Sequence, residues 1–389
     1  MDPDESVDRS YVVDLLKDLV ATNSVNPTVG RGPGESVIAK LIADRLDAIN
    51  GLEVRTQPVV GERSNVIAVM KGSGGGRSLM LNGHMDTVGV DGMIIDPFKP
   101  SIQGDMLRGR GACDMKGALA AMIGAVKSTA DSGKRLRGDL VFGAVVDEEY
   151  KSLGIKRLVQ EYRTDAAIVG EPTTMKVATA HKGFVWIEIE VKGKAAHGSV
   201  PEKGVDAIAQ ATKIVSATEK LQRDLGNRAH PLLGTPKIHT STIHGGTDWS
   251  IVPERCVLGF ERRTLPGESV TSVMAEIEDI FNIIRQENAD FMATARSPYD
   301  MPPLETAESE PIVQLAQQSL AENMGEEAPV IGVPYWTDGA LLSMLGAIPT
   351  CLFGPGDIRV AHSADEYVSL ESVLSSARVY STIIQRYCS

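Results

Sequence analysis

Several short apolar runs along this chain end at residues that are able to bind metal ions. Residues 140–146 are apolar and are followed by Glu148 and Glu149. Three other runs repeat this arrangement: residues 78–83 before His84 and Asp86, residues 166–170 before Glu171, and residues 348–354 before a loop with His362 and the pair Asp365–Glu366. Ligands of open α/β sheets bind beyond the carboxyl ends of the strands. If these runs are strands of one sheet, the pattern predicts a metal site at that edge.

The adjacent acids Glu148 and Glu149 are the most specific part of this pattern. Successive side chains of a strand point to opposite faces, so two adjacent acids serve one reaction centre only where the strand has ended. One carboxylate would then hold a metal ion while the other transfers a proton. The alternative is a solvated acidic turn, because charged residues are mostly exposed.

Asp114 and His84 each have a structural alternative to a role in metal binding. Asp114 precedes a predicted helix at 115–129, and Asp is a favoured helix N-cap. His84 and Asp86 share one face of an extended segment, so Asp86 is placed to orient the imidazole of a metal ligand. A buried histidine of this kind is also compatible with a packed core position.

The pattern changes between residues 183 and 297, where a second domain is predicted. Its expected elements are a strand at 184–191, a helix at 205–225, strands at 237–244 and 256–264, a helix at 270–286 and a strand at 291–295. The order β-α-β-β-α-β is that of a ferredoxin-like unit. The segment would therefore be an α+β insertion in an α/β domain made of residues 1–182 and 298–389.

Length, charge and cysteine content narrow the function classes. The chain has 389 residues, which is long for one core and fits two domains. It carries 39 Lys and Arg against 51 Asp and Glu, a net charge of −12 without a basic run, which argues against nucleic acid or anionic membrane as a partner. We expect no signal peptide and no membrane span, since no run reaches ~18 apolar residues. The four widely spaced cysteines favour reduced thiols in the cytoplasm.

Five sequence strings together resemble one enzyme family. They are residues 83–88 (GHMDTV), 109–117 (GRGACDMKG), 147–149 (DEE), 170–173 (GEPT) and 361–363 (AHS). In this order they resemble the zinc-dependent family of acetylornithine deacetylase, succinyl-diaminopimelate desuccinylase, aminoacylase and carboxypeptidase G. The resemblance runs from about residue 10 to the C-terminus. It implies a metallopeptidase-like catalytic domain with a mixed sheet and flanking helices, and an inserted ferredoxin-like domain for dimerisation that also covers the site as a lid.

The resemblance also implies a role for each residue of the site. Asp114 would bridge two zinc ions in each subunit, which Co²⁺ or Mn²⁺ would be able to replace. His84 and Glu171 would complete the shell of one ion, and Glu149 and His362 that of the other. Glu148 would be the general base and then the general acid, and Asp86 would orient His84.

Three residues of the predicted insertion resemble family positions near the substrate. His197 would reach the active site of the partner subunit and stabilise the oxyanion, unless it is an ordinary surface-loop histidine. Arg263 would bind a substrate carboxylate bidentately, or else form a structural ion pair with neighbouring acids. Ser250 stands where relatives commonly carry an Asn that contacts substrate, and Trp249 is unusual at its position. Both departures concern the substrate, not the reaction.

These observations predict a cytoplasmic, homodimeric two-zinc amidohydrolase that acts on N-acyl amino acids. Acetylornithine is the first expected substrate and succinylated diaminopimelate the next. A metallo-dipeptidase or carboxypeptidase is the enzymatic alternative. A catalytically silent protein that binds metal or a small amide is disfavoured, because every expected ligand and the base are present.

Overall fold

The computed structural model describes residues 7–325 and 329–389, and this chain forms two compact units. The first unit contains the described residues of 1–179, 306–331 and 337–389, and the second contains 180–305 and 332–336. The predicted second domain, 183–297, lies within this second unit. The last strand of this unit continues past residue 295 to Met301, across a register shift between Arg296 and Tyr299.

The first unit is built around a mixed sheet with the order β1–β2–β6–β3–β7–β15–β8, and β13 and β14 also pair with β8. The strands are β1 (Leu52–Val60), β2 (Arg63–Met70), β3 (Leu79–His84), β6 (Leu140–Val145), β7 (Ala166–Val169), β8 (Ala178–His181) and β15 (Thr350–Leu352). β13 (Leu304–Glu305) and most of β14 (Ile331–Val333) belong to the residues of the second unit. The neighbours β6, β3, β7 and β15 run parallel to one another. Their carboxyl ends therefore lie at one edge, as the apolar runs predict.

The central strands are buried on both faces. All residues of β3 and β6 are buried, which is typical of parallel strands covered by helices. A Cβ on Gly83 would meet Met115 and Leu119 on one face of the sheet. On the other face, Gly143 is the register partner of Asn82, and a Cβ there would meet Leu158. Helices α3 and α4 thus cover opposite faces of the sheet.

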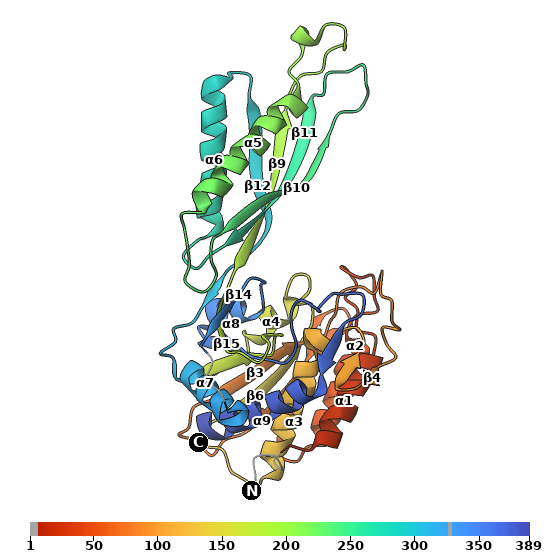
Figure 1. The fold of residues 1–389 in the computed structure, drawn as a ribbon, viewed down its shortest axis with the longest axis vertical. Helices are drawn as coiled ribbons and strands as arrows, with labels where there is room; N and C mark the ends of the chain where they lie inside the picture. The colour runs from red at the N-terminus through yellow and green to blue at the C-terminus, as the bar shows by residue number, and fades with distance from the viewer. Residues whose placement is uncertain (1–6, 326–328) are drawn as a thin grey trace. The chain divides into compact units, whose positions relative to one another are not determined.

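Helices and a small sheet complete the first unit (Figure 1). The helices are α1 (Arg9–Ala21), α2 (Ser36–Asp47), α3 (Gly117–Asp131), α4 (Leu153–Leu158), α7 (Pro311–Met324), α8 (Gly339–Gly346) and α9 (Leu370–Tyr387), and the irregular turn η2 (Ala112–Lys116) precedes α3. Helix α3 packs against α1 and α9, and α9 packs against α7. The small sheet has the order β16–β5–β4, from β4 (Ser101–Gln103), β5 (Met106–Arg108) and β16 (Tyr367–Ser369).

The second unit has the predicted β-α-β-β-α-β order. Its elements are β9 (Gly183–Lys192), the short 3₁₀ turn η3 (Pro201–Lys203), α5 (Ala207–Leu225), β10 (Lys237–Gly245), β11 (Arg255–Thr264), α6 (Val270–Glu287) and β12 (Met292–Met301). The strands form an antiparallel sheet with the order β10–β11–β9–β12. Apolar residues of α5 and α6 pack with alternate residues of β9 and β11 in one core. The opposite face carries charged pairs such as Arg296–Glu188 and Arg255–Glu190.

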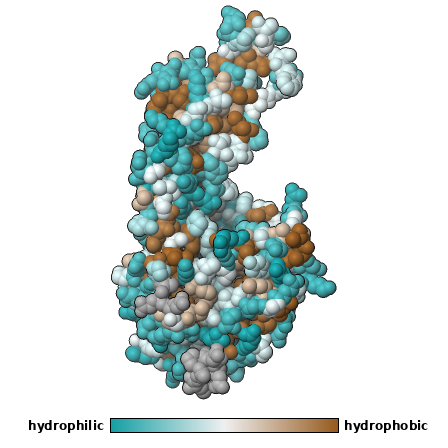
Figure 2. All heavy atoms as spheres, in the orientation of Figure 1, coloured by the Kyte–Doolittle hydropathy of each residue, from teal (hydrophilic) through white to brown (hydrophobic). Residues whose placement is uncertain are grey.

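The surface of the molecule is mainly polar. Figure 2 shows separate hydrophobic patches among hydrophilic residues on the face that is drawn. Within the described ranges, no helix has both the length and the apolar character needed to cross a membrane.

Candidate metal centre

The four parallel strands of the first unit bring the predicted ligands to one edge of its sheet. β3 ends at His84, β6 leads to Glu148 and Glu149, β7 leads to Glu171, and β15 leads to the loop with His362. The two acids Asp365 and Glu366 were expected to converge there as well, but neither belongs to a metal-compatible group of the described residues. Parallel pairing of the four strands explains why residues up to 278 positions apart meet, from His84 to His362.

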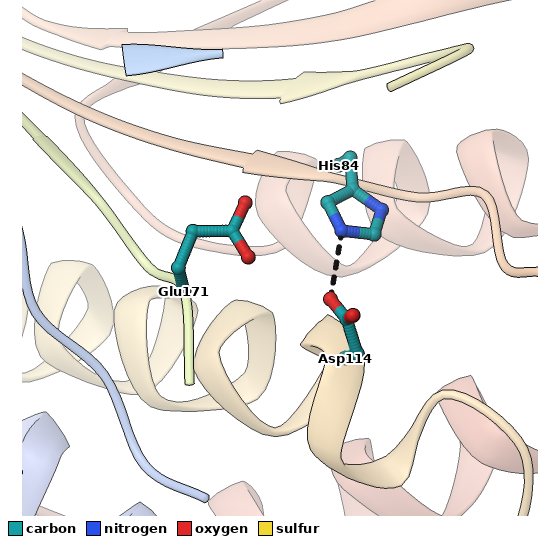
Figure 3. A group of neighbouring side chains, drawn as sticks. All are labelled: His84, Asp114 and Glu171. Carbon is teal, nitrogen blue, oxygen red and sulfur yellow. Dashed lines mark hydrogen bonds and ion pairs between the residues drawn. The ribbon is translucent and has the colours of Figure 1, made fainter. Parts of the chain in front are cut away.

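Asp114 lies between two histidines. Its Oδ1 is 3.0 Å from Nε2 of His84, and its Oδ2 is 3.3 Å from Nε2 of His362 (Figure 3 shows the first of these contacts). Asp114 lies in the irregular turn η2, where its φ of −121° and ψ of 95° are not helical, and α3 begins at Gly117 with Lys116 as its N-cap. The alternative that Asp114 caps the predicted helix is therefore wrong.

Two groups of side chains in the described structure have a geometry that suits metal binding, and they share Asp114. One is His84, Asp114 and Glu171; the other is Asp114, Glu149 and His362. In each group the donor atoms lie within 4.8 Å of one another. Nε2 of His362 is 3.2 Å from Oε1 of Glu149. Because Asp114 presents a different oxygen to each group, it is placed to bridge two cations.

The chemistry of the donors also suits divalent cations. Oε1 of Glu171 is buried and has no hydrogen-bond partner among the described residues. A buried carboxylate oxygen is costly without a hydrogen bond or a cation. Two imidazoles and three carboxylates, without a thiolate, are ligands that zinc, cobalt and manganese accept. The residues present therefore fit a pair of such ions.

The pKa shifts of the site show how crowded its negative charges are. Burial raises the pKa of Glu148 well above its ordinary value, and the neighbouring charges of Glu171 and Asp338 raise it further. Burial and the charge of Asp114 raise the pKa of Glu171 in the same way. Positive charge at this position would lower both, as metal ions generally do for nearby acids.

Glu148 and Glu149 do not form a solvated acidic turn. Both are only partly exposed, and the side chain of Glu149 retains 9% of its exposure while it contacts His362. Glu148 is absent from both ligand groups of the described residues. It is therefore near the site but free to take another role.

Asp86 contacts His84 in a different way from the one predicted. The backbone carbonyl of Asp86 lies 2.9 Å from Nδ1 of His84, whereas its nearer carboxylate oxygen is 3.6 Å away. That carboxylate instead accepts the backbone N–H groups of Glu148 at 3.1 Å and of Glu149 at 3.2 Å. Asp86 thus orients the imidazole through its main chain and supports the acidic turn through its side chain.

Glu366 holds the loop that presents Asp114. Its Oε1 accepts the backbone N–H groups of Cys113 at 2.9 Å and of Asp114 at 3.0 Å. Its Oε2 accepts from Nη1 of Arg110 at 2.7 Å and from the backbone N–H of Gly111 at 2.9 Å. Glu366 is 1% exposed, so these four bonds are shielded from water. The sequence marks this acid only as one more residue after a strand.

His197, Ser250 and Arg263 all belong to the second unit. His197 and Ser250 lie on adjacent backbone segments: His197 forms a β-bridge with Ile251, and Gly198 donates its N–H to the carbonyl of Ser250 at 2.7 Å. Both residues are exposed, and Nδ1 of His197 lies 2.8 Å from the hydroxyl and 3.2 Å from the backbone nitrogen of Ser199. The two metal-compatible groups of the first unit are therefore formed without residues of the second unit.

Arg263 has the local partners that the structural alternative predicts. Its Nε donates to Oε1 of Glu261 at 2.7 Å, and its guanidinium lies 5.5 Å from the ring centroid of Phe184. The side chain of Arg263 keeps 33% of its exposure. It is therefore held in place and still accessible to a carboxylate.

Sequence reasoning missed several buried residues that contact the acidic turn. Asn26, Glu35, Arg63 and Asp147 surround Asp86 and the start of the turn. The first three follow no apolar strand and belong to no string of the family, so the sequence shows no signal for them.

Known proteins resemble this chain in sequence and in structure. The profile of peptidase family M20/M25/M40 matches residues 80–386. An acetylornithine deacetylase of Vibrio cholerae is 31% identical over 385 residues, which cover 97% of this chain and 98% of that protein. The aminopeptidase PepT of Bacillus cereus has a TM-score of 0.80 at 21% identity, with 99% of this chain and 100% of that chain covered. A dinuclear metal binding peptidase of Bacillus subtilis has a TM-score of 0.75 at 16% identity, with 98% of each chain covered.

Proposed function

Because this chain belongs to peptidase family M20/M25/M40, and so is a metal-dependent hydrolase of amide bonds, we propose that it is a two-zinc deacylase of N-acyl amino acids. One observation carries the proposal of two ions. The two carboxylate oxygens of Asp114 face different histidines, and each belongs to a separate group of three ligands. His84 and Glu171 would hold one ion and Glu149 and His362 the other, with Asp114 between them.

The reaction would depend on Glu148 as the base. When bound, the two cations would polarise the scissile carbonyl and lower the pKa of water at the site. A carboxylate oxygen of Glu148 accepts the proton of the attacking water, and the water oxygen bonds to the carbonyl carbon. Glu148 then donates that proton to the nitrogen, the C–N bond breaks, and the products are a carboxylic acid and a free amine.

Acetylornithine is the first substrate to test. Relatives that bear the name acetylornithine deacetylase align over nearly the whole chain, which supports an N-acetyl amino acid. Arg263 would bind the α-carboxylate of such a substrate, and Ser250 would replace an amide contact with a hydroxyl. His197 would help to stabilise the oxyanion from the partner subunit.

A cytoplasmic homodimer is the assembly that we propose. The second unit carries exposed apolar side chains near His197 and Ser250, namely Trp249, Ile251 and Val200, which supports an interface there. All four cysteines are free and buried, which supports a reducing compartment. The molar mass in solution, measured by light scattering, tests the dimer.

The experiment that tests the function is amine release from a matched substrate panel. The panel contains N-acetyl, N-succinyl and N-formyl amino acids together with dipeptides, each assayed with and without a chelator. We expect release from the N-acetyl class, its loss with chelator, and its return on addition of Zn²⁺.

The other outcomes separate the alternatives. Hydrolysis of dipeptides alone would favour a metallo-dipeptidase, and preference for N-succinyl substrates would favour a desuccinylase. Silence across the panel from folded protein loaded with two ions would contradict the deacylase and indicate a binding function.

A further inference from the structure

The turn that carries Glu148 and Glu149 is held by buried charged residues from the first 63 positions of the chain. Glu35 immediately precedes α2, and Arg63 is the first residue of β2. Asn26 follows α1 along the chain. All three lie before residue 80, where the match to the family profile begins.

Arg63 and Glu35 form a bidentate ion pair that contacts Asp147. Nε and Nη2 of Arg63 donate to the two oxygens of Glu35 at 2.5 and 2.6 Å. Nη2 of Arg63 also donates to Oδ1 of Asp147 at 2.9 Å, and Oε1 of Glu35 accepts the backbone N–H of Asp147 at 3.0 Å. The side chain of Glu35 is fully buried and that of Arg63 is 14% exposed. Bidentate pairs of this kind fix orientation as well as distance.

Asn26 connects this pair to the rest of the turn. Its amide nitrogen donates to Oδ1 of Asp147 at 3.1 Å and to Oδ2 of Asp86 at 2.8 Å. Asp86 in turn accepts the backbone N–H groups of Glu148 and Glu149. Three consecutive backbone N–H groups, from Asp147 to Glu149, therefore all donate to buried carboxylates.

The backbone of Asp147 needs this support. Its φ is +70°, in the left-handed region that a residue with a side chain adopts at a cost. Such conformations persist where the surrounding structure determines them, and they are concentrated at functional sites. Because Glu148 and Glu149 follow directly, the direction of both carboxylates depends on the conformation of Asp147.

We propose that Arg63, Glu35 and Asn26 are positioning residues that aim Glu149 at the metal group it shares with His362, and Glu148 at the reacting atoms. The proposal rests on the proposed function, since it assumes two ions and a base. It predicts an asymmetry, because the group of His84, Asp114 and Glu171 includes neither residue of this turn. Loss of the contacts that this network of Arg63, Glu35 and Asn26 makes with Asp147 should weaken the binding of one ion and leave the binding of the other unchanged.

The test is metal binding to Arg63→Met, measured by competition with a chromophoric chelator using Zn²⁺ and Co²⁺. Wild-type protein should bind two ions. The variant should keep one with unchanged affinity and bind the other about 10- to 100-fold more weakly, the usual effect of losing a residue that orients a ligand. With saturating metal, kcat should fall by about 10-fold or more while KM changes less than about 3-fold. A matched control is Arg55→Met, since Arg55 is exposed on the neighbouring strand β1.

Each remaining outcome decides the proposal. Folded Arg63→Met protein that binds both ions as tightly as wild type contradicts it, and so does equal weakening of both ions. If Arg63→Met does not fold, Glu35→Gln is measured in the same way with the same expectation, because Glu35 bonds to Arg63 and to the backbone of Asp147. If neither variant folds, the network serves the fold as a whole and the proposal is wrong. Wild-type protein with fewer than two ions would contradict the proposed function itself, and that result is seen without any variant.

Discussion

The candidate residues of the two units differ in how the surrounding structure holds them. In the first unit, His84, Asp114 and Glu171 are buried and contact residues that are distant in the sequence. In the second unit, His197 and Arg263 are more exposed, and their side chains form hydrogen bonds with residues two positions away, Ser199 and Glu261. The first arrangement is organised before any ligand arrives, whereas the second offers groups that a substrate or partner would have to order. Preorganisation is the feature expected of residues that perform chemistry, and adaptable groups suit recognition.

The largest effect is expected where the preorganised site performs proton transfer. Glu148→Gln should keep both ions and lower kcat by about 10²- to 10⁴-fold, since general acid–base catalysis contributes this much. Metal content and kcat, measured on the same sample, check the prediction. Activity within about 10-fold of wild type, a difference of only ~1.4 kcal/mol, would show that the base is another residue.

A smaller effect is expected one contact away from the ligands. The carboxylate of Glu366 accepts four hydrogen bonds from residues 110–114. In Glu366→Gln, an NH₂ group that can only donate replaces one of the two accepting oxygens. Because Asp114 is shared by both groups, both ions should bind about 10- to 100-fold more weakly. Glu371→Gln is the control, since Glu371 is exposed on α9. Selective loss of one ion would contradict the shared role of Asp114.

The residues of the second unit should affect substrate choice more than turnover. Arg263→Ala should lower kcat/KM for a substrate with a free carboxylate by about 10-fold, near the lower end of a charged hydrogen bond at ~1.5 kcal/mol. The effect should vanish for the carboxamide analogue of the same substrate. Arg296→Ala provides a control, because Arg296 pairs with Glu188 on the same sheet. An equal loss for both substrates would leave Arg263 with a purely structural role.

The same contrast explains how much the sequence predicts. The fold class and the convergence of His84, Glu149, Glu171 and His362 follow from apolar runs that end in acids and histidines, because parallel pairing of β6, β3, β7 and β15 brings their ends together. Asp114 follows no such run, and the five family strings single it out. The support for the site is less visible. Glu35 and Arg63 look like ordinary surface charges in the sequence, and only the packing of α2 and β2 buries them. The sequence predicts that the last strand of the second unit ends at residue 295, whereas β12 continues across a register shift to Met301.

The smallest expected effect is on the stability of the metal-free protein. The direction in which this stability changes with pH is set by the titratable groups of the metal centre. Burial would lower the pKa of His362, but the carboxylates of Asp114 and Glu149 raise it to about 10. A folded-state pKa above the unfolded value of about 6.5 stabilises the metal-free protein fully below pH 6.5, and this contribution is lost as the pH rises to about 10. The pKa values of Glu148 and Glu171 are also raised, chiefly by burial, so these acids act in the same direction.

The melting temperature of chelated protein should therefore fall between pH 6.5 and 10, while protein loaded with Zn²⁺ should change less. Bound ions require deprotonated ligands, so the loaded protein has already released these protons. Because groups elsewhere on the surface titrate equally in both samples, the difference between the two curves isolates the site. The pKa of Asp114 is lowered, so its contribution is constant across this range. If the difference does not grow with pH, metal binding does not displace protons from His362 and the buried acids. That result would contradict the proposed second ion.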